Sequence, residues 1–170
     1  IGGGGWSALR LAAGDAGREA RSLHAQTVAL AFPTTDADLA IRLVEAAVAG
    51  NYLCQTYKPE DDRSPAVGTW LAVGVAPSDA ASAAVKSADV RLRWQAWARD
   101  LVNAPAADLY PESLAARARE LAAQPGVEVD VWDIDRCKAE GMTGIVAVGQ
   151  GSEKPGCMIH VKYRPVGAGK

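Results

Sequence analysis

The spacing of apolar residues predicts alternating helices and strands over the first hundred positions. Apolar residues recur at helical spacing over residues 7–23, 35–54 and 78–102, which predicts three helices. Two short apolar runs, at 27–32 and 69–75, end at or just before a proline and predict buried strands. This alternation is typical of an α/β fold.

Polar residues mark where these helices are expected to begin. Ser7, Thr35 and either Ser78 or Asp79 are the expected N-caps, because their side-chain oxygens can accept hydrogen bonds from free amide groups. The third helix is expected to end at Asn103-Ala-Pro105, since the residue before a proline avoids the α region.

The pattern continues beyond this break. Pro111 is suited to the first position of a helix that Gln124-Pro-Gly126 would end. Valines alternate with polar residues from position 127 and predict a strand over 127–132, followed by a short helix over 134–140.

Two more apolar runs, at 144–149 and 158–164, predict strands. The connection at 150–156 is too short for a crossover helix, so we expect the two strands to form an antiparallel hairpin. Residues 165–170 are interpreted as a tail or a linker.

Composition excludes several classes of protein. Lys and Arg number 18 against 20 Asp and Glu, which leaves no basic footprint for nucleic acid. No apolar run reaches the roughly 18 residues that a membrane span needs, so no membrane partner is expected. The three cysteines are widely separated and odd in number, which predicts reduced thiols in a reducing compartment.

Two glycine motifs are similar to patterns that bind nucleotides or phosphate groups. Gly3-x-Gly5-x-x-Ala8 fits a loose dinucleotide pattern, but the expected acidic residue is missing: the second strand ends at Phe32-Pro33, and Asp36 comes too late. A glycine-rich turn between a strand and a helix is the alternative. Gly149-x-Gly151-Ser152 resembles a phosphate cradle, but no helix is predicted after it, so a hairpin turn is favoured.

Other polar residues do not assemble a catalytic site by their spacing. His24 ends a helix, where a positive charge favours the helix dipole, and His160 has no carboxylate nearby in the sequence. Cys157 and His160 are expected on opposite faces of a strand, and Asp61-Asp62 is expected to be a solvated surface patch.

Four blocks of sequence, taken in order, resemble the leucyl aminopeptidase (cytosol aminopeptidase) family of two-metal exopeptidases. They are Leu9 to Arg21; Glu45 to Lys58, with its Gly…Tyr…Tyr-Lys pattern; Ala98-Arg-Asp-Leu-Val-Asn-Ala-Pro105 with Pro111; and Gly141 to Ser152 followed by Ile159 to Tyr163. One departure is Lys154-Pro-Gly-Cys-Met158, where the family usually has paired prolines and an arginine.

The resemblance implies a fold and a domain organisation. Residues 1–77 would be the end of a macrodomain-like N-terminal α/β part, 78–102 an interdomain helix, and 103–170 the opening β/α units of the catalytic domain. The chain is thus expected to be incomplete at both ends.

The resemblance also implies the chemistry of a cytoplasmic metalloexopeptidase acting on peptides, assembled as a homohexamer. Two divalent ions (Mn, Zn or Mg) would be held by side chains in the remainder of the catalytic domain, so no catalytic, metal or cofactor-binding residue is assigned here. Gln150, Gly151 and Ser152 would at most be scaffold near that site. The alternatives are a macrodomain-like module binding a nucleotide or ADP-ribose at the Gly2–Gly5 turn, and a non-catalytic assembly chain.

Overall fold

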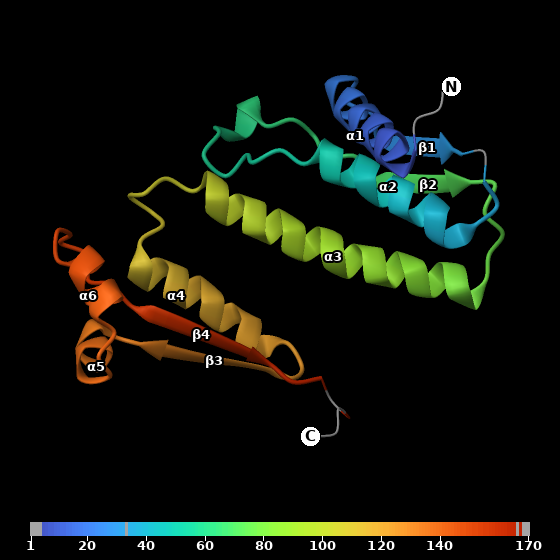
Figure 1. Ribbon diagram of the computed structural model, residues 1–170. Coiled ribbons are helices and arrows are strands. Elements are labelled where there is room, and N and C mark those ends of the chain that lie inside the picture. The colour runs from blue at the N-terminus through green and yellow to red at the C-terminus, as the bar shows by residue number, and fades with distance from the viewer. Residues whose placement is uncertain (1–4, 33, 166, 168–170) are drawn as a thin grey trace. The chain divides into compact units, whose positions relative to one another are not determined.

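The computed structural model describes residues 5–32, 34–165 and 167, and it confirms a mixed α/β architecture. The chain divides into two compact units, Ile1–Asn103 and Ala104–Lys170. Each unit contains a two-stranded sheet with helices packed against it (Figure 1).

The first unit is a strand–helix–strand arrangement with an additional helix at each end. Its elements are α1 (Trp6–Ser22), β1 (Thr27–Ala31), α2 (Ala37–Asn51), the 3-10 helix η1 (Glu60–Asp62), β2 (Thr69–Val73) and α3 (Asp79–Asn103). Strands β1 and β2 are parallel, in register from Thr27↔Thr69 to Ala31↔Val73. Helix α2 lies between α1 and α3 and also contacts β2 (Figure 1). The predicted helices and strands of this half are therefore confirmed, but the expectation that the strands are buried is wrong, because exposed and half-buried residues alternate along both.

Small residues allow α1 and α2 to pack closely. Ala13, Leu43 and Ala47 form the buried cluster of this unit, with Leu30 and Trp70 packed against it from the strands. Gly17 and Gly50 lie where the two backbones nearly touch. A Cβ atom on Gly17 would overlap the carbonyl oxygen of Ala47, and one on Gly50 would overlap that of Gly14.

The helix starts differ from two of the three predictions. Ser7 is not the N-cap of α1: Gly5 is, with extended backbone angles and no side-chain cap. Helix α2 begins one residue later than predicted, because the Asp36 carboxylate rather than Thr35 accepts hydrogen bonds from the amides of Asp38 (2.9 Å) and Leu39 (3.2 Å). The prediction for the third helix is confirmed, since Ser78 Oγ accepts from the Ala81 amide at 3.1 Å.

The second unit packs helix α4 against an antiparallel strand pair. Its elements are α4 (Pro111–Arg119), the 3-10 helix η2 (Glu120–Ala123), β3 (Val127–Trp132), α5 (Ile134–Ala139), α6 (Thr143–Gly149) and β4 (Met158–Tyr163). Pro111 occupies the first turn of α4, as predicted. Strands β3 and β4 pair from Val127↔Tyr163 to Trp132↔Met158, and α5 and α6 lie at one end of the pair (Figure 1).

The predicted strand at 144–149 is wrong: these residues form helix α6. An apolar run this short fits either structure by its periodicity, and as a helix it forms its own backbone hydrogen bonds, such as Val146 N–H to Met142 O at 3.2 Å. The predicted hairpin is therefore wrong as well. Strand β4 is antiparallel, but its partner is β3.

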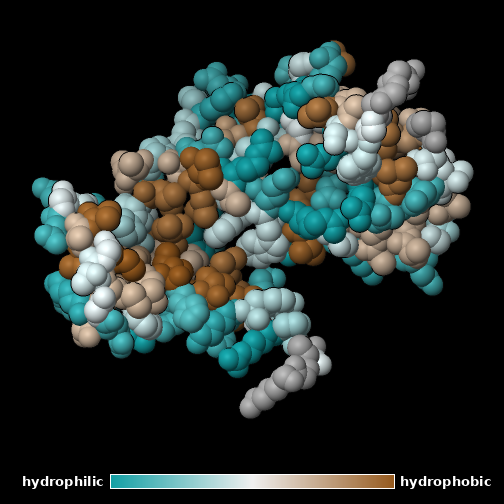
Figure 2. Space-filling view, viewed as in Figure 1, coloured by the Kyte–Doolittle hydropathy of each residue, from teal (hydrophilic) through white to brown (hydrophobic). Residues whose placement is uncertain are grey.

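Large apolar side chains are exposed on both units, where they interrupt the hydrophilic surface (Figure 2). In the first unit Leu23 on the end of α1 is 70% exposed, and in the second Val148 on α6 is 86% exposed.

Candidate functional site

Two of the blocks that carry the family resemblance meet at Tyr52, beside the end of α3. The Tyr52 hydroxyl donates a hydrogen bond of 2.6 Å to the Asp100 carboxylate and accepts one of 3.4 Å from Asn103 Nδ2. The Arg99 guanidinium lies over the Tyr52 ring, 3.9 Å from its centroid, and donates to the Ala49 carbonyl at 2.7 Å. This group, the Tyr52 cluster, joins the end of α2 to the last turn of α3.

The electrostatics of the Tyr52 cluster suit a structural role. Burial, followed by the hydrogen bond to Asp100 and its negative charge, raises the pKa of Tyr52 to about 12. The hydroxyl therefore keeps its proton at physiological pH and acts as a fixed donor to Asp100. A tyrosine with a raised pKa is a poor general base, so we assign this residue to packing rather than to proton transfer.

Removing the Tyr52 hydroxyl is expected to weaken the first unit and to change its response to alkali. Tyr52→Phe leaves Asp100 without its donor, at a cost of about 1–2 kcal/mol. Because the pKa in the folded state is raised to about 12, above that of the unfolded chain, the stabilisation is complete below pH ~10 and is lost as pH rises through ~12. Denaturation from pH 8 to pH 12 measures this. The difference between wild type and variant should shrink with pH, and a constant difference would contradict the assignment.

The glycine motif at 149–152 is a turn between a helix and a strand. Helix α6 ends at Gly149, the Ser152 amide donates to the Gly149 carbonyl at 3.2 Å, and β4 follows. The hairpin-turn prediction is thus wrong, because α6 replaces the first strand. The next element is a strand, so among the described residues after this turn no helix directs its dipole at a phosphate.

The departure at 154–158 shapes a cavity of about 480 Å³ within the second unit. Ile145 and Val148 of α6 line it together with Lys154 and Cys157. The Lys154 ammonium also lies 4.4 Å from the centroid of the Tyr110 ring. The Cys157 thiol donates to the Pro111 carbonyl at 3.2 Å, and its burial raises the pKa of the thiol, which disfavours a nucleophilic thiolate.

The register of the strands gives His160 a neighbour that sequence spacing did not reveal. His160 is opposite Asp130, which lies 30 positions earlier in the chain. The Asp130 carboxylate accepts hydrogen bonds from Trp132 Nε1 (2.6 Å) and Arg136 (3.3 Å). The Trp132 bond is the main cause of the lowered pKa of Asp130. Asp130 is therefore already engaged within its own strand and the following helix.

The remaining candidates stay apart. Exposed His24 follows α1 in a left-handed conformation with φ 51°, and Asp61 and Asp62 lie exposed on η1. All three cysteines are free thiols. Residues 1–4, which include Gly3 of the first glycine motif, lie outside the described residues, while Gly5 is the N-cap of α1 and Ala8 lies within that helix.

The described residues do not fit a divalent metal pair. Among them no group of three or more His, Cys, Asp or Glu side chains lies close enough together to hold an ion. We therefore assign no reaction step through a metal to residues of this chain. Within the same described part, no helix has the length and apolar character needed to cross a bilayer.

Comparison with known proteins identifies relatives along nearly the whole chain. Residues 96–170 match the model of the cytosol aminopeptidase family, catalytic domain. The probable cytosol aminopeptidase of Leifsonia xyli subsp. xyli is 40% identical over 159 residues, which cover 93% of this chain and 32% of that protein. That of Synechococcus sp. is 36% identical over 160 residues, covering 92% and 32%. The chain thus spans about a third of the length of these curated relatives.

Solved structures agree with these relatives. The bottromycin maturation enzyme BotP, in complex with Mn, aligns with a TM-score of 0.77 and 29% identity over 97% of this chain and 35% of its own. A tomato leucine aminopeptidase mutant has the same fold, with a TM-score of 0.79 at 22% identity over 99% of this chain and 35% of its own. Residues 96–170 thus match the catalytic domain of the cytosol (leucyl) aminopeptidase family, and nearly the whole chain is similar to proteins named probable cytosol aminopeptidases.

Proposed function

We propose that this chain is the part of a metal-dependent aminopeptidase that leads into its catalytic domain, and that the whole protein removes N-terminal residues from peptides. The observation that carries the proposal is the match of residues 96–170 to the catalytic-domain model, extended toward the N-terminus by relatives named as probable cytosol aminopeptidases. These relatives do not favour the nucleotide-binding or assembly alternatives.

We also propose the finer organisation that the family resemblance implies. Residues 1–77 are proposed as the macrodomain-like N-terminal part, 78–102 as the interdomain helix and 103–170 as the start of the catalytic domain. We propose that residues of the whole enzyme outside this chain bind two divalent metal ions. Manganese is supported by the Mn complex of BotP. We also propose a cytoplasmic location and a homohexamer.

The exposed apolar surface of the second unit supports this organisation. Val148 on α6 is 86% exposed and Tyr163 at the end of β4 is 68% exposed. Covering such side chains stabilises a protein by about 25 cal/mol per Å² of apolar surface. The remainder of the catalytic domain is the proposed cover.

A chimeric enzyme tests the proposal. This chain replaces the matching third of the Leifsonia xyli relative, and release of leucine from leucine p-nitroanilide is measured with Mn²⁺. We expect hydrolysis that EDTA abolishes in the chimera, and none from the 170-residue chain alone. Hydrolysis by the chain alone would overturn the proposal, as would a folded but inactive chimera beside an active parent enzyme.

A further inference from the structure

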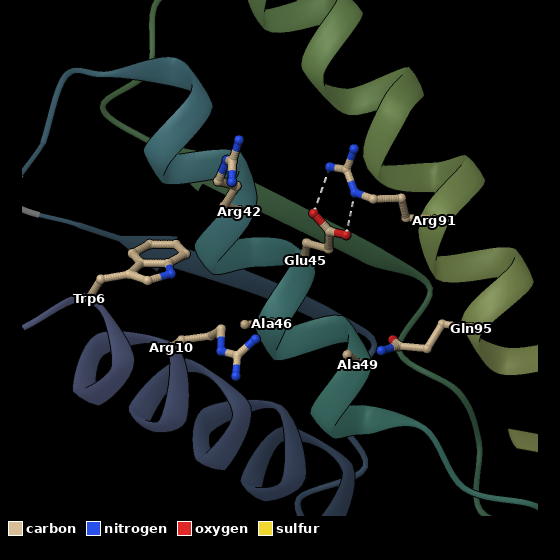
Figure 3. A pocket seen from close by; sticks show the side chains of 8 residues that line it. All are labelled: Trp6, Arg10, Arg42, Glu45, Ala46, Ala49, Arg91 and Gln95. Carbon is tan, nitrogen blue, oxygen red and sulfur yellow. Dashed lines mark hydrogen bonds and ion pairs between the residues drawn. The ribbon is translucent and has the colours of Figure 1, made fainter.

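A pocket in the first unit is lined by three arginines from three helices. It has a volume of about 470 Å³ and lies among α1, α2 and α3. Figure 3 shows Trp6 and Arg10 on α1, Arg42 and Glu45 on α2, and Arg91 and Gln95 on α3 around this space. Ala49 also lines the pocket and shares its carbonyl with the Tyr52 cluster, whereas the three arginines of the pocket do not belong to that cluster.

One arginine of the pocket neutralises its acidic residue. Arg91 donates from Nε and Nη2 to the two carboxylate oxygens of Glu45, both at 2.7 Å, and from Nη1 to Ser87 Oγ at 2.6 Å. The hydrogen bonding to Glu45 raises the pKa of Arg91. The pair fixes one wall of the pocket, so free donors for a ligand must come from the other two arginines.

Those two arginines have donors to spare. Arg42 uses only Nε, in a 2.7 Å ion pair with Asp38, and its two terminal amino groups bond to no other described residue. Arg10 forms no hydrogen bond or ion pair within the described part of the chain. Arg91 and Arg42 are each balanced by a carboxylate, so among the described residues Arg10 supplies the positive charge of the pocket that has no acidic partner.

The chemistry of the walls defines the class of ligand. Planar guanidinium groups match the oxygens of a carboxylate or phosphate and hold them in paired hydrogen bonds. The Trp6 ring is 41% exposed at the edge of the pocket, and the small side chains of Ala46 and Ala49 leave room beside it. A volume of about 470 Å³ is in the range of small-molecule sites and exceeds what a bare oxyanion fills.

We propose that this pocket is a binding site for a small organic anion, whose carboxylate or phosphate group contacts Arg10 and Arg42 while its planar or apolar part lies against Trp6. The site goes beyond the proposed peptidase activity, because none of its residues belongs to the part matched by the catalytic-domain model.

Titration of the full chain with defined anions tests the site. The probes are phenyl phosphate and benzoate, with inorganic phosphate and neutral benzyl alcohol for comparison. Binding is followed by the NMR signal of the Trp6 indole N–H, assigned with the Trp6→Phe variant. We expect a saturable shift with at least one aromatic anion, weaker binding of inorganic phosphate, and none of benzyl alcohol. The tighter of the two aromatic probes identifies the preferred anionic group.

Two arginine variants on α1 separate a specific site from a general effect of charge. Arg10→Ala is expected to weaken binding about tenfold or more through loss of charge-assisted hydrogen bonds. Arg18→Ala removes the same charge from an arginine of α1 that does not line the pocket and is paired with Asp15, so binding should change less than about twofold, because exposed charges are screened. Arg10→Lys keeps the positive charge but loses the paired guanidinium donors, so its affinity for the anion should lie between those of the two alanine variants.

Several results would overturn the site. They are the absence of a saturable shift at millimolar probe, equal weakening by Arg10→Ala and Arg18→Ala, or inorganic phosphate binding as tightly as phenyl phosphate. Arg10 is exposed, so its variants are expected to remain folded, and circular dichroism checks this.

Discussion

Replacing Gly17 by alanine is expected to destabilise the first unit by about 3 kcal/mol, since a new methyl group cannot fit against the helix that crosses it. Gly17 is buried on α1, and a Cβ atom there would overlap the Ala47 carbonyl oxygen, which belongs to backbone and cannot rotate away. The two helices must separate to admit it. Hydrogen exchange of the α1 and α2 amides in wild type and variant measures the loss.

Gly14 provides the matched control, one turn earlier on the same helix. A Cβ on Gly14 would lie 3.7 Å from the Ala46 carbonyl oxygen, an ordinary contact. Gly14→Ala should therefore leave the packing intact and stabilise the helix by up to about 1 kcal/mol through intrinsic helix propensity. Equal protection in the two variants would show that α1 and α2 do not approach as closely as described.

Replacing Gly126 by alanine is expected to destabilise the second unit by about 3 kcal/mol, from backbone strain and overlap combined. Gly126 has φ +77°, a conformation that alanine adopts only at a cost, and a Cβ there would overlap the Arg164 carbonyl oxygen. The contact lies where the Arg164 amide donates to the Gly126 carbonyl at 2.7 Å, beside the ends of β3 and β4. Hydrogen exchange of the β3 and β4 amides in wild type and variant measures this loss of stability.

Gly141 separates the two contributions. Its φ is +71°, but no atom lies within 4 Å of the position that a Cβ would take. Gly141→Ala should therefore lose only about 1 kcal/mol, the cost of the backbone conformation. If Gly126→Ala and Gly141→Ala proved equally stable, overlap with Arg164 would be excluded as a cause.

The pattern of apolar and polar residues within a segment predicted most helices and strands correctly. The apolar runs that contain β1 and β2 predicted strands correctly, although exposed and half-buried residues alternate along both strands in the structure. The segment at 144–149 is the exception, because its own residues do not distinguish a strand from a helix. Its valines and isoleucine favour a strand by propensity, yet its place after the α5 turn, with Gly141 in a left-handed conformation, leads it into α6.

The spacing of residues along the sequence could not predict the tertiary contacts. Tyr52 and Asp100 are 48 positions apart, and only the orientation of α2 against α3 brings them together. The arginines of the pocket, Arg10, Arg42 and Arg91, come from three separate helices in the same way. The family resemblance singled out both blocks that form the Tyr52 cluster without indicating that they touch.

The anchoring of the last turn of α3 has a consequence for dissecting the protein. Asn103 donates to the Arg99 carbonyl at 2.7 Å and to Tyr52, while Pro105 lacks an amide with which to continue the helix. The C-terminal end of α3 is thus capped by hydrogen bonds to residues of its own unit. A protease that cuts at residues 104–105 should release an N-terminal fragment whose final helix does not fray.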